Sequence, residues 1–139
     1  MKADVFLDSN VLLHAAANVQ TEAEKKAAAL RLIAETDFGT SVQVLGEFFD
    51  NARRKARLCI PERTMREILT LLRTRPLVEE TVKLFDHSVA LAERYQVRYY
   101  DAAILAAAME LGCKTLFTED LADGRNYSGV SVVNPFRSR

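Results

Sequence analysis

The segment at residues 5–16, VFLDSNVLLHAA, contains the signal that decides the fold. Its first three residues form a β-branched and aromatic run that is too short for a helix, whereas Val11 onwards carries apolar residues at helical spacing. A strand therefore passes into a helix at Asp8. This carboxylate either caps the helix or belongs to a ligand site beyond the carboxyl end of the strand, where open parallel sheets bind their ligands. The segment by itself leaves both interpretations open.

The rest of the chain alternates between helical and extended patterns. Helical patterns occur at residues 21–36, from 41 to about 58, after Pro61, at 81–95 and at 102–111. Short strands are expected at 113–118 and 129–134, whereas FGTS at 38–41 is interpreted as a break between helices. Strands separated by helices predict an α/β fold with a parallel sheet. No repeat or linker divides the sequence, so we expect a single domain over residues 1–139.

Composition and charge exclude several classes of protein. Hydrophobic residues make up 49% of the chain and charged residues 27%, as in an ordinary globular protein. The formal net charge is zero, so any nucleic-acid binding must come from local patches. Cys59 and Cys113 lie far apart in apolar contexts, which is typical of reduced core thiols. No stretch reaches the roughly 20 apolar residues that cross a bilayer, and no signal-peptide region precedes Asp8, so we expect a cytoplasmic protein without membrane contact.

Three further carboxylates resemble Asp8 in their placement. Glu47 lies at the edge of the apolar stripe of the helix that follows FGTS, and no cation stands three or four residues away to pair with it. Asp101 precedes a helix that is apolar on nearly every face, where capping explains it equally well. Asp120 follows a strand as Asp8 does, with Glu119 beside it as an alternative. Of the four acids, Asp8 and Asp120 thus end strands. The other two belong to helices that we expect to flank the same sheet edge.

A cluster of these acids would require a cation. Two carboxylates about 4 Å apart repel each other by roughly 4 kcal/mol at an effective dielectric constant near 20. Convergence therefore needs either protonation or a bound ion, and an all-oxygen set without His or Cys suits Mg²⁺ or Mn²⁺ rather than zinc. Such ions retain water and bind substrate phosphates. The chemistry that follows is phosphodiester hydrolysis by an activated water.

Four stretches resemble the PIN domain, and specifically the VapC toxins of VapBC toxin–antitoxin systems. They are VFLDSNVLLHA, QVLGEFFDNARRK, YYDAAILAAAMELGCKTLFTEDLADG and VSVVNPF, and the resemblance extends over residues 4–136. It implies a PIN-like α/β/α sandwich with a central, mainly parallel sheet, and a Mg²⁺- or Mn²⁺-dependent endoribonuclease that cleaves RNA. It also implies a homodimer and a cognate VapB-type antitoxin, whose C-terminal segment covers the acidic pocket.

The same resemblance gives roles to individual side chains. Asp8 and Asp101 would bind the metal directly, and Glu47 and Asp120 would bind it directly or through water. Asp8 is then a ligand, and the task of capping the following helix falls to Ser9 or Asn10.

Three more residues are expected to contribute to the pocket or to substrate binding. By the resemblance, Asn10 orients a ligand or water and Thr118 lines the pocket. Arg54 shares the helix edge of Glu47, so we expect it to meet an RNA phosphate, which a guanidinium binds bidentately. The neighbouring Lys55 and Arg57 point to other sides of the helix and are interpreted as solvated.

The residues around Asp8 argue against two other classes of protein that collect acids at strand ends. A phosphoacceptor receiver domain needs an acidic pair after its first strand, but Ser9 follows Asp8. A haloacid-dehalogenase-type phosphatase needs a second Asp two residues on, where the chain has Asn10. The alternative that remains is a PIN-fold protein without catalysis, acting as a metal- or partner-binding module.

Overall fold

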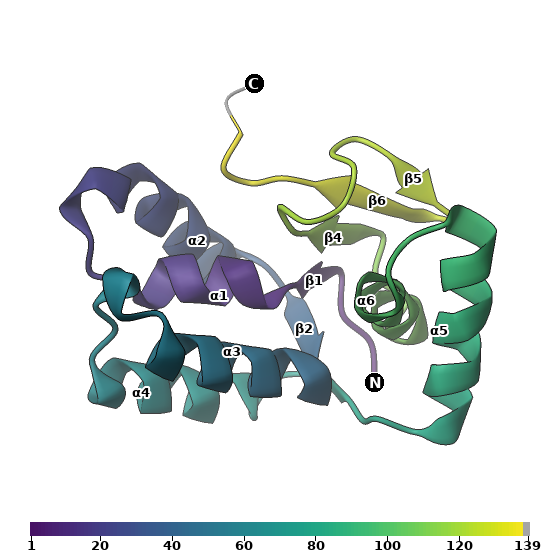
Figure 1. Cartoon of the computed structure of the whole chain (residues 1–139), viewed down its shortest axis with the longest axis horizontal. Coiled ribbons are helices and arrows are strands. Elements are labelled where there is room, and N and C mark those ends of the chain that lie inside the picture. Colours follow the sequence, from purple (N-terminus) through teal and green to yellow (C-terminus); the bar gives the residue numbers. More distant parts are fainter. Residues whose placement is uncertain (138–139) are drawn as a thin grey trace.

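A computed structural model describes residues 1–137 (Figure 1), and residues 138 and 139 of the predicted domain lie outside this part. The strands are β1 (Val5–Leu7), β2 (Phe38–Ser41), β3 (Leu77–Val78), β4 (Thr115–Phe117), β5 (Asn126–Tyr127) and β6 (Val130–Val133). The α-helices are α1 (Ser9–Ala16), α2 (Ala23–Glu35), α3 (Val42–Arg54), α4 (Glu62–Leu72), α5 (Val82–Tyr95) and α6 (Tyr99–Glu110). Two short 3-10 helices, η1 (Gln20–Glu22) and η2 (Ala56–Leu58), precede α2 and follow α3.

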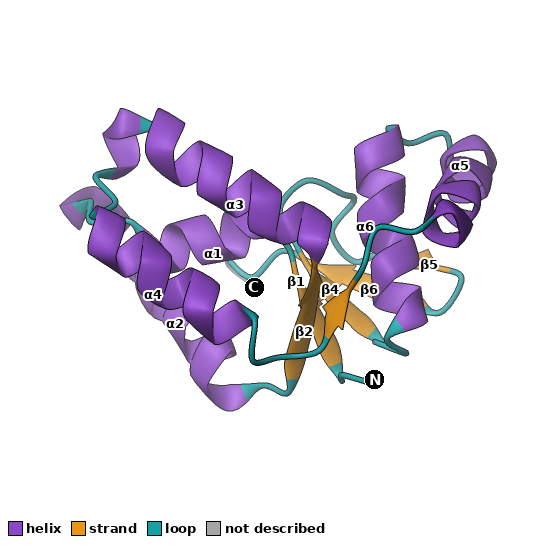
Figure 2. Cartoon of the chain, turned by 90° about the horizontal axis from the view of Figure 1, so that it is seen from below, coloured by secondary structure: helices purple, strands orange, loops and turns teal. Residues whose placement is uncertain are grey.

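The described strands form one six-stranded sheet in the order β3-β2-β1-β4-β6-β5. Neighbouring strands run parallel except β5 and β6, which are antiparallel. Helices α1 to α4 lie on one side of the sheet, and α5 and α6 lie on the other (Figure 2). This arrangement confirms the predicted α/β/α sandwich around a mainly parallel sheet.

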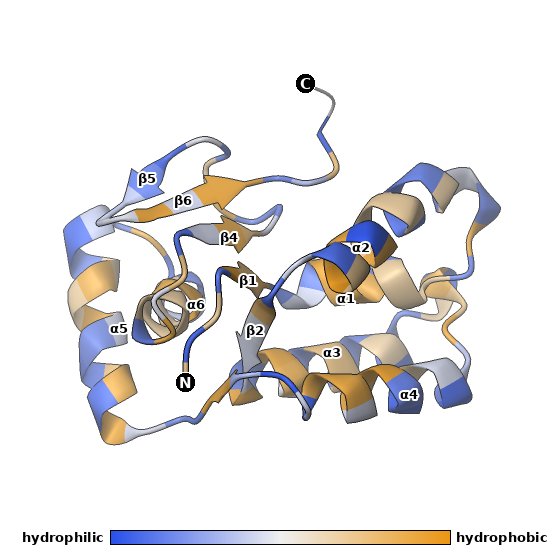
Figure 3. Cartoon of the chain, turned by 180° about the vertical axis from the view of Figure 1, so that it is seen from behind, coloured by the Kyte–Doolittle hydropathy of each residue, from blue (hydrophilic) through white to orange (hydrophobic). Residues whose placement is uncertain are grey.

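The core lies where the helices face the sheet. Figure 3 shows β1 and β6 as largely hydrophobic, whereas α5 alternates between hydrophobic and hydrophilic turns. Phe6 and Leu7 of β1 are fully buried, and every residue of α6 from Ala102 to Ala108 is buried. The prediction that this apolar helix is buried is therefore confirmed. Its run of small side chains lets the helix pack closely against the sheet.

The expectation that residues 38–41 form a break was wrong, because these residues form β2. All four are buried, with β1 on one side and β3 on the other. Gly39 is needed for this packing, since a Cβ atom there would lie only 2.6 Å from Cδ1 of Leu111. Ser41 ends the strand and caps α3 as predicted, its Oγ accepting a hydrogen bond from the backbone N–H of Val44 at 3.3 Å.

Smaller differences concern element ends and cysteines. Helix α3 ends at Arg54, and η2 continues the chain where one helix was expected to reach residue 58. The two-residue strands β3 and β5 were not predicted. Both cysteines are free as expected, but only Cys113 is buried, and the placement of Cys59 in the core was wrong because it is exposed. Of the helices in residues 1–137, none combines the length and apolarity needed to cross a membrane.

Candidate active site

The carboxyl ends of the parallel strands bring polar residues together at one edge of the sheet. Strands β1 and β4 pair with Leu7 opposite Phe117. The next residues, Asp8 and Thr118, are therefore neighbours across the sheet. The Thr118 hydroxyl donates a hydrogen bond to Oδ2 of Asp8 at 2.8 Å, which links segments 110 residues apart in the sequence.

Two helices add residues near their N-terminal ends to this edge. The Gln43 side chain of α3 donates a hydrogen bond to the backbone oxygen of Tyr100 in α6 at 3.2 Å. The contact joins the start of α3, which carries Glu47, to the start of α6, which carries Asp101. The charge of Glu47 acts on the pKa of Asp8, and the charge of Asp101 acts on that of Glu47, so the three acids interact.

Asp8 is the most buried of the four acids, with only 4% of its surface exposed. Its Oδ1 accepts a hydrogen bond from the backbone N–H of Ser9 at 2.7 Å. Burial raises the pKa of Asp8 to about 7. The hydrogen bonds from Thr118 and Ser9 lower this pKa, whereas the charges of Asp120 and Glu47 raise it. Asp8 thus becomes easier to protonate as the site is assembled.

A hydroxyl at the centre of the site connects three polar residues. The Thr118 oxygen donates to Asp8 and accepts from Nδ2 of Asn10 at 3.2 Å and from the backbone N–H of Asp120 at 3.1 Å. Nδ2 of Asn10 also donates to Oδ2 of Asp120 at 3.2 Å. Because a carboxylate only accepts, this contact fixes the orientation of the Asn10 amide. Its Oδ1 is buried and has no hydrogen-bond partner among residues 1–137.

Glu47 and Asp101 are half-buried and influenced by the same neighbours. Burial raises the pKa of Glu47, a hydrogen bond with Gln43 lowers it, and the charges of Asp120 and Asp101 raise it. Burial also raises the pKa of Asp101, and the charge of Asp120 adds to this effect. Arg98 lowers both pKa values. Sequence analysis missed this cation, whose available signal was its position three residues before Asp101.

Capping accounts for Asp8 but not for Asp101. Asp8 is the N-cap of α1, so the expectation that Ser9 or Asn10 caps this helix was wrong. The second carboxylate oxygen of Asp8 is directed away from the cap, so one side chain serves both the helix and the acidic cluster. In α6 the N-cap is Arg98, and Asp101 lies within the first turn.

Glu119 and Asp120 are adjacent in sequence but have different partners. Asp120 accepts from Asn10 and acts electrostatically on the other acids. Glu119 instead accepts a hydrogen bond from Nε2 of His14 at 3.1 Å, and the His14 ring packs on Phe136 with centroids 4.4 Å apart. The geometry therefore brings Asp120, and not Glu119, into the cluster with Asp8.

The structure holds Arg54 in a local contact. Its guanidinium forms an ion pair with Asp50 at 3.2 Å and a hydrogen bond with Asn51 at 2.8 Å. The spacing of four residues between Asp50 and Arg54 is visible in the sequence and was the signal for this pair. An RNA contact by Arg54 stays a prediction, and it would require these bonds to open.

The PIN-domain profile matches residues 5–122, a range that includes all four acids. The chain belongs to the PIN-domain family. No curated protein has a sequence similar enough to be matched with this PIN domain.

Solved structures with the same fold include a toxin–antitoxin complex and a toxin. A toxin–antitoxin complex from Klebsiella pneumoniae matches this PIN domain with a TM-score of 0.70 and 20% identity, covering 97% of this chain and 100% of that chain. VapC20 of Mycobacterium tuberculosis, described as a sarcin–ricin loop cleaving toxin, matches with a TM-score of 0.65 and 19% identity over 84% and 92%. FitAcB of Neisseria gonorrhoeae matches with a TM-score of 0.63 and 19% identity, covering 96% of this chain and 99% of that chain. At these identities the likeness shows a shared fold.

The oxygen atoms of the PIN site fit a hard divalent ion. Each carboxylate oxygen of Asp8 accepts one hydrogen bond and has a further lone pair, and Oδ1 of Asn10 is a buried acceptor without a partner in the described chain. Within residues 1–137, no three His, Cys, Asp or Glu side chains stand close enough to form a complete metal site. Mg²⁺ does not require such a group, because one or two carboxylates hold it while water completes its shell.

Proposed function

We propose that this PIN domain is a metal-dependent endoribonuclease that acts as the toxin of a VapBC-type toxin–antitoxin system in the cytoplasm. The observation that carries the proposal is the convergence of Asp8, Glu47, Asp101 and Asp120 at the carboxyl edge of a parallel sheet in a PIN fold. Burial and neighbouring charges raise the pKa values of Asp8, Glu47 and Asp101, and groups with such shifts concentrate at functional sites. An acidic cluster of this kind repels RNA phosphates unless a cation is bound.

Each acid has a proposed role toward Mg²⁺ or Mn²⁺. Asp8 and Asp101 would hold the ion directly, and Glu47 and Asp120 would hold it directly or through water. When bound, the ion supplies an activated water for attack on phosphorus and stabilises the leaving oxygen. Asn10 holds the carboxylate of Asp120 in place through its Nδ2 group.

Around these ligands, two other residues prepare the site. Thr118 orients Asp8 by donating to one of its oxygens, and its bond favours the ionised carboxylate that a metal requires. Arg98 offsets part of the negative charge at Glu47 and Asp101 and favours their ionised forms in the same way.

We expect cleavage of RNA in Mg²⁺ or Mn²⁺ and no cleavage in excess EDTA. The products should carry 5′-phosphate and 3′-hydroxyl ends, because the site has no pair of free histidines to activate the RNA 2′-hydroxyl. His14 is bonded to Glu119, and His87 is exposed on α5, on the other side of the sheet. Gel electrophoresis measures the cleavage, and mass spectrometry of a cut oligonucleotide identifies the ends.

Two results would contradict this mechanism. Undiminished cleavage in EDTA would exclude a metal requirement. A 2′,3′-cyclic phosphate on the upstream product would show that the RNA 2′-hydroxyl attacks the phosphorus. If calorimetry detects Mn²⁺ binding while RNA remains uncut, the chain is a metal-binding PIN module without catalysis.

An antitoxin is the proposed protein partner. The support comes from the structural neighbours: the Klebsiella pneumoniae match is a toxin–antitoxin complex, and VapBC2 of Rickettsia felis, bound to a DNA fragment from its promoter, matches with a TM-score of 0.61 and 15% identity. The partner of this PIN domain would be a small protein with a DNA-binding fold and an extended tail. An adjacent reading frame of that kind would identify it.

A homodimer is proposed on the basis of an exposed apolar patch at the start of α5 and α6. Val82 is 76% exposed, Phe85 51% and Tyr100 57%. Tyr99 links the two helices, with its ring centroid 5.6 Å from that of Phe85 and 5.1 Å from that of Tyr100. A contiguous apolar patch of this kind is a typical interface, and it adjoins Asp101 of the acidic cluster.

We expect Phe85→Ser to shift the protein from dimer to monomer, because it removes a large apolar side chain from the centre of this patch. Light scattering coupled to gel filtration measures the mass. Leu71→Ser is the matched control, since Leu71 is an exposed apolar residue of α4 on the other side of the sheet. A dimer that survives Phe85→Ser, or dissociates equally with Leu71→Ser, would contradict the assignment.

A further inference from the structure

A cavity of about 260 Å³ adjoins the acidic cluster on the side of Asn10. Three basic residues from separate elements line it: Lys25 of α2, Lys55 at the end of α3 and Arg57 of η2. Glu119 contributes to the same wall. The fold therefore gathers cations that the sequence distributes over two distant segments.

These three cations are free to bind an anion. No ion pair involves Lys25, Lys55 or Arg57 among residues 1–137, whereas Arg54 is held by Asp50. Two carboxylates also line the cavity, but Glu119 is bonded to His14. With Glu22 as the second acid, the three basic groups of this wall still outnumber the two carboxylates.

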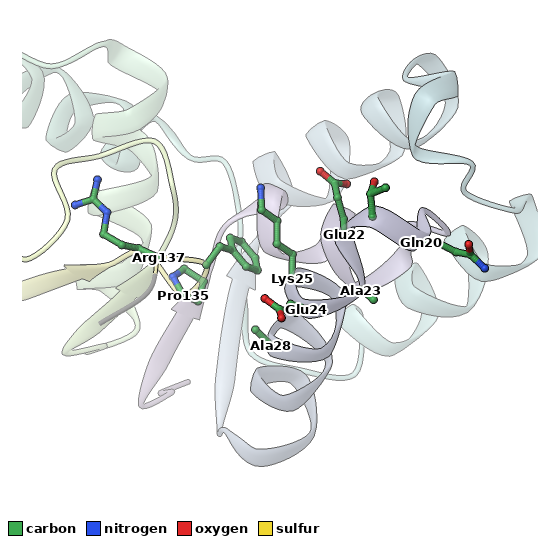
Figure 4. A pocket seen from close by; sticks show the side chains of 10 residues that line it. Gln20, Glu22, Ala23, Glu24, Lys25, Ala28, Pro135 and Arg137 are labelled. Atoms are coloured by element: carbon green, nitrogen blue, oxygen red, sulfur yellow. The ribbon is translucent and has the colours of Figure 1, made fainter.

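The cavity is continuous with the acidic cluster through Asn10. This residue lines the cavity while its Nδ2 donates to Oδ2 of Asp120. On its outer side, a second cavity of about 550 Å³ shares Glu22 and Lys25 with the first. Figure 4 shows Lys25 between Glu22 and the C-terminal segment that carries Pro135 and Arg137. A nucleic-acid strand that extends from the acids past Asn10 into this cavity would meet Lys25.

We propose that Lys25, Lys55 and Arg57 form a phosphate-binding subsite for a nucleotide that flanks the cleaved bond. The inference rests on the proposed ribonuclease function. An RNA strand has a negative charge at every linkage, but the acidic cluster accommodates only the phosphate opposite a bound cation. The neighbouring phosphate needs basic groups of the protein, and these three are placed where it would lie. The proposal gives Lys55 and Arg57 a role beyond that of solvated residues.

RNA binding without cleavage tests the subsite. In protein carrying Asp101→Asn and held in EDTA, fluorescence anisotropy of a labelled decauridylate measures affinity between 50 and 200 mM salt. The triple variant Lys25→Gln, Lys55→Gln, Arg57→Gln should bind about tenfold more weakly. The magnitude of its slope of log K against log salt should fall by about 0.7, because a single strand loses roughly 0.7 per phosphate contact and the subsite holds one phosphate.

A second triple variant, Lys2→Gln, Arg73→Gln, Lys114→Gln, is the matched control. These exposed cations precede β1, β3 and β4, so they lie toward the opposite edge of the sheet from the acids, and they form no ion pair within residues 1–137. The control removes the same charge and should change affinity and slope much less. Circular dichroism melts verify that both variants are folded.

Each other result has a separate meaning. Equal losses in the two triple variants would overturn the subsite and leave only a general charge effect. The first triple variant could instead lose binding of deca-glutamate while it binds decauridylate as before. That result would show that the cavity binds an acidic protein segment and not RNA. Failure of the Asp101→Asn protein to bind RNA both in EDTA and in Mg²⁺ would overturn the subsite and the proposed function together. Loss of RNA binding as expected, in a protein that cuts no RNA with any metal, would overturn catalysis alone.

Discussion

Replacing Asp8 by Asn is expected to abolish RNA cleavage while raising the free energy of unfolding at neutral pH. The carboxylate is almost completely buried, and its pKa is raised from 3.8 to about 7. A shift of this size corresponds to about 4 kcal/mol of stability lost on ionisation above pH 7. An amide has no charge to desolvate, and its oxygen can still accept from Ser9. Its NH2 group then faces the Thr118 oxygen, which already accepts from Asn10 and from the N–H of Asp120, so the bond to Thr118 is lost. We therefore expect Asp8→Asn to recover about half of the free energy of unfolding that the wild type loses when Asp8 ionises.

The gain should depend on pH in a defined direction. The stability contributed by protonated Asp8 is fully present below pH 3.8 and is lost as the pH rises through about 7. The advantage of Asp8→Asn over the wild type should therefore grow between pH 5 and pH 8. Urea denaturation of the metal-free proteins in EDTA measures this difference.

Asp50→Asn is the control for Asp8→Asn. Asp50 is an exposed carboxylate on α3 that pairs with Arg54, so its loss should leave cleavage intact and change stability by less than about 1 kcal/mol. If Asp8→Asn cuts RNA as fast as the wild type, Asp8 acts only as the helix cap and is not a metal ligand. Because Asn caps a helix as well as Asp does, a variant less stable than the wild type would contradict the expected cost of burying the Asp8 carboxylate.

Replacing Thr118 by Val is expected to cost about 2–4 kcal/mol of stability and most of the activity. The substitution keeps the shape of a fully buried side chain but removes the oxygen that serves Asp8, Asn10 and the N–H of Asp120. Buried groups left without partners cost about 1–3 kcal/mol each. The pKa of Asp8 should rise further, because the lost bond is one of those that lower it.

Thr118→Ser separates this hydrogen-bond effect from packing. Serine keeps the hydroxyl and loses one methyl group, so it should retain cleavage while losing about 1 kcal/mol of stability. Cleavage rates and urea denaturation are measured for both variants. Equal cleavage by Thr118→Val and the wild type would show that the hydroxyl does not prepare Asp8.

The parts of the fold that the sequence predicts are those determined by local pattern. The strand-to-helix junction at Asp8 is local, because a short apolar run and a helical spacing meet there. Strand β2 is different, since its extended form depends on strands on both sides and on Gly39 facing Leu111. Four residues without alternation carry no such information.

The same distinction applies to the site. The order and spacing of the acids identify Asp8, Glu47 and Asp101 as candidates, but a turn decides which way adjacent residues point. Sequence alone cannot separate Glu119 from Asp120, because the separation depends on His14 and Asn10, more than 100 residues earlier.

The long-range character of this site has a consequence for the synthesis of the protein. Asp8 and Asn10 leave the ribosome early, but they acquire Thr118 and Asp120 only after a further 110 residues have been translated. The pairing of β1 with β4 must wait for the same residues. A nascent chain therefore lacks the assembled site until translation has passed Asp120, and the proposed RNA cleavage would begin only after that point.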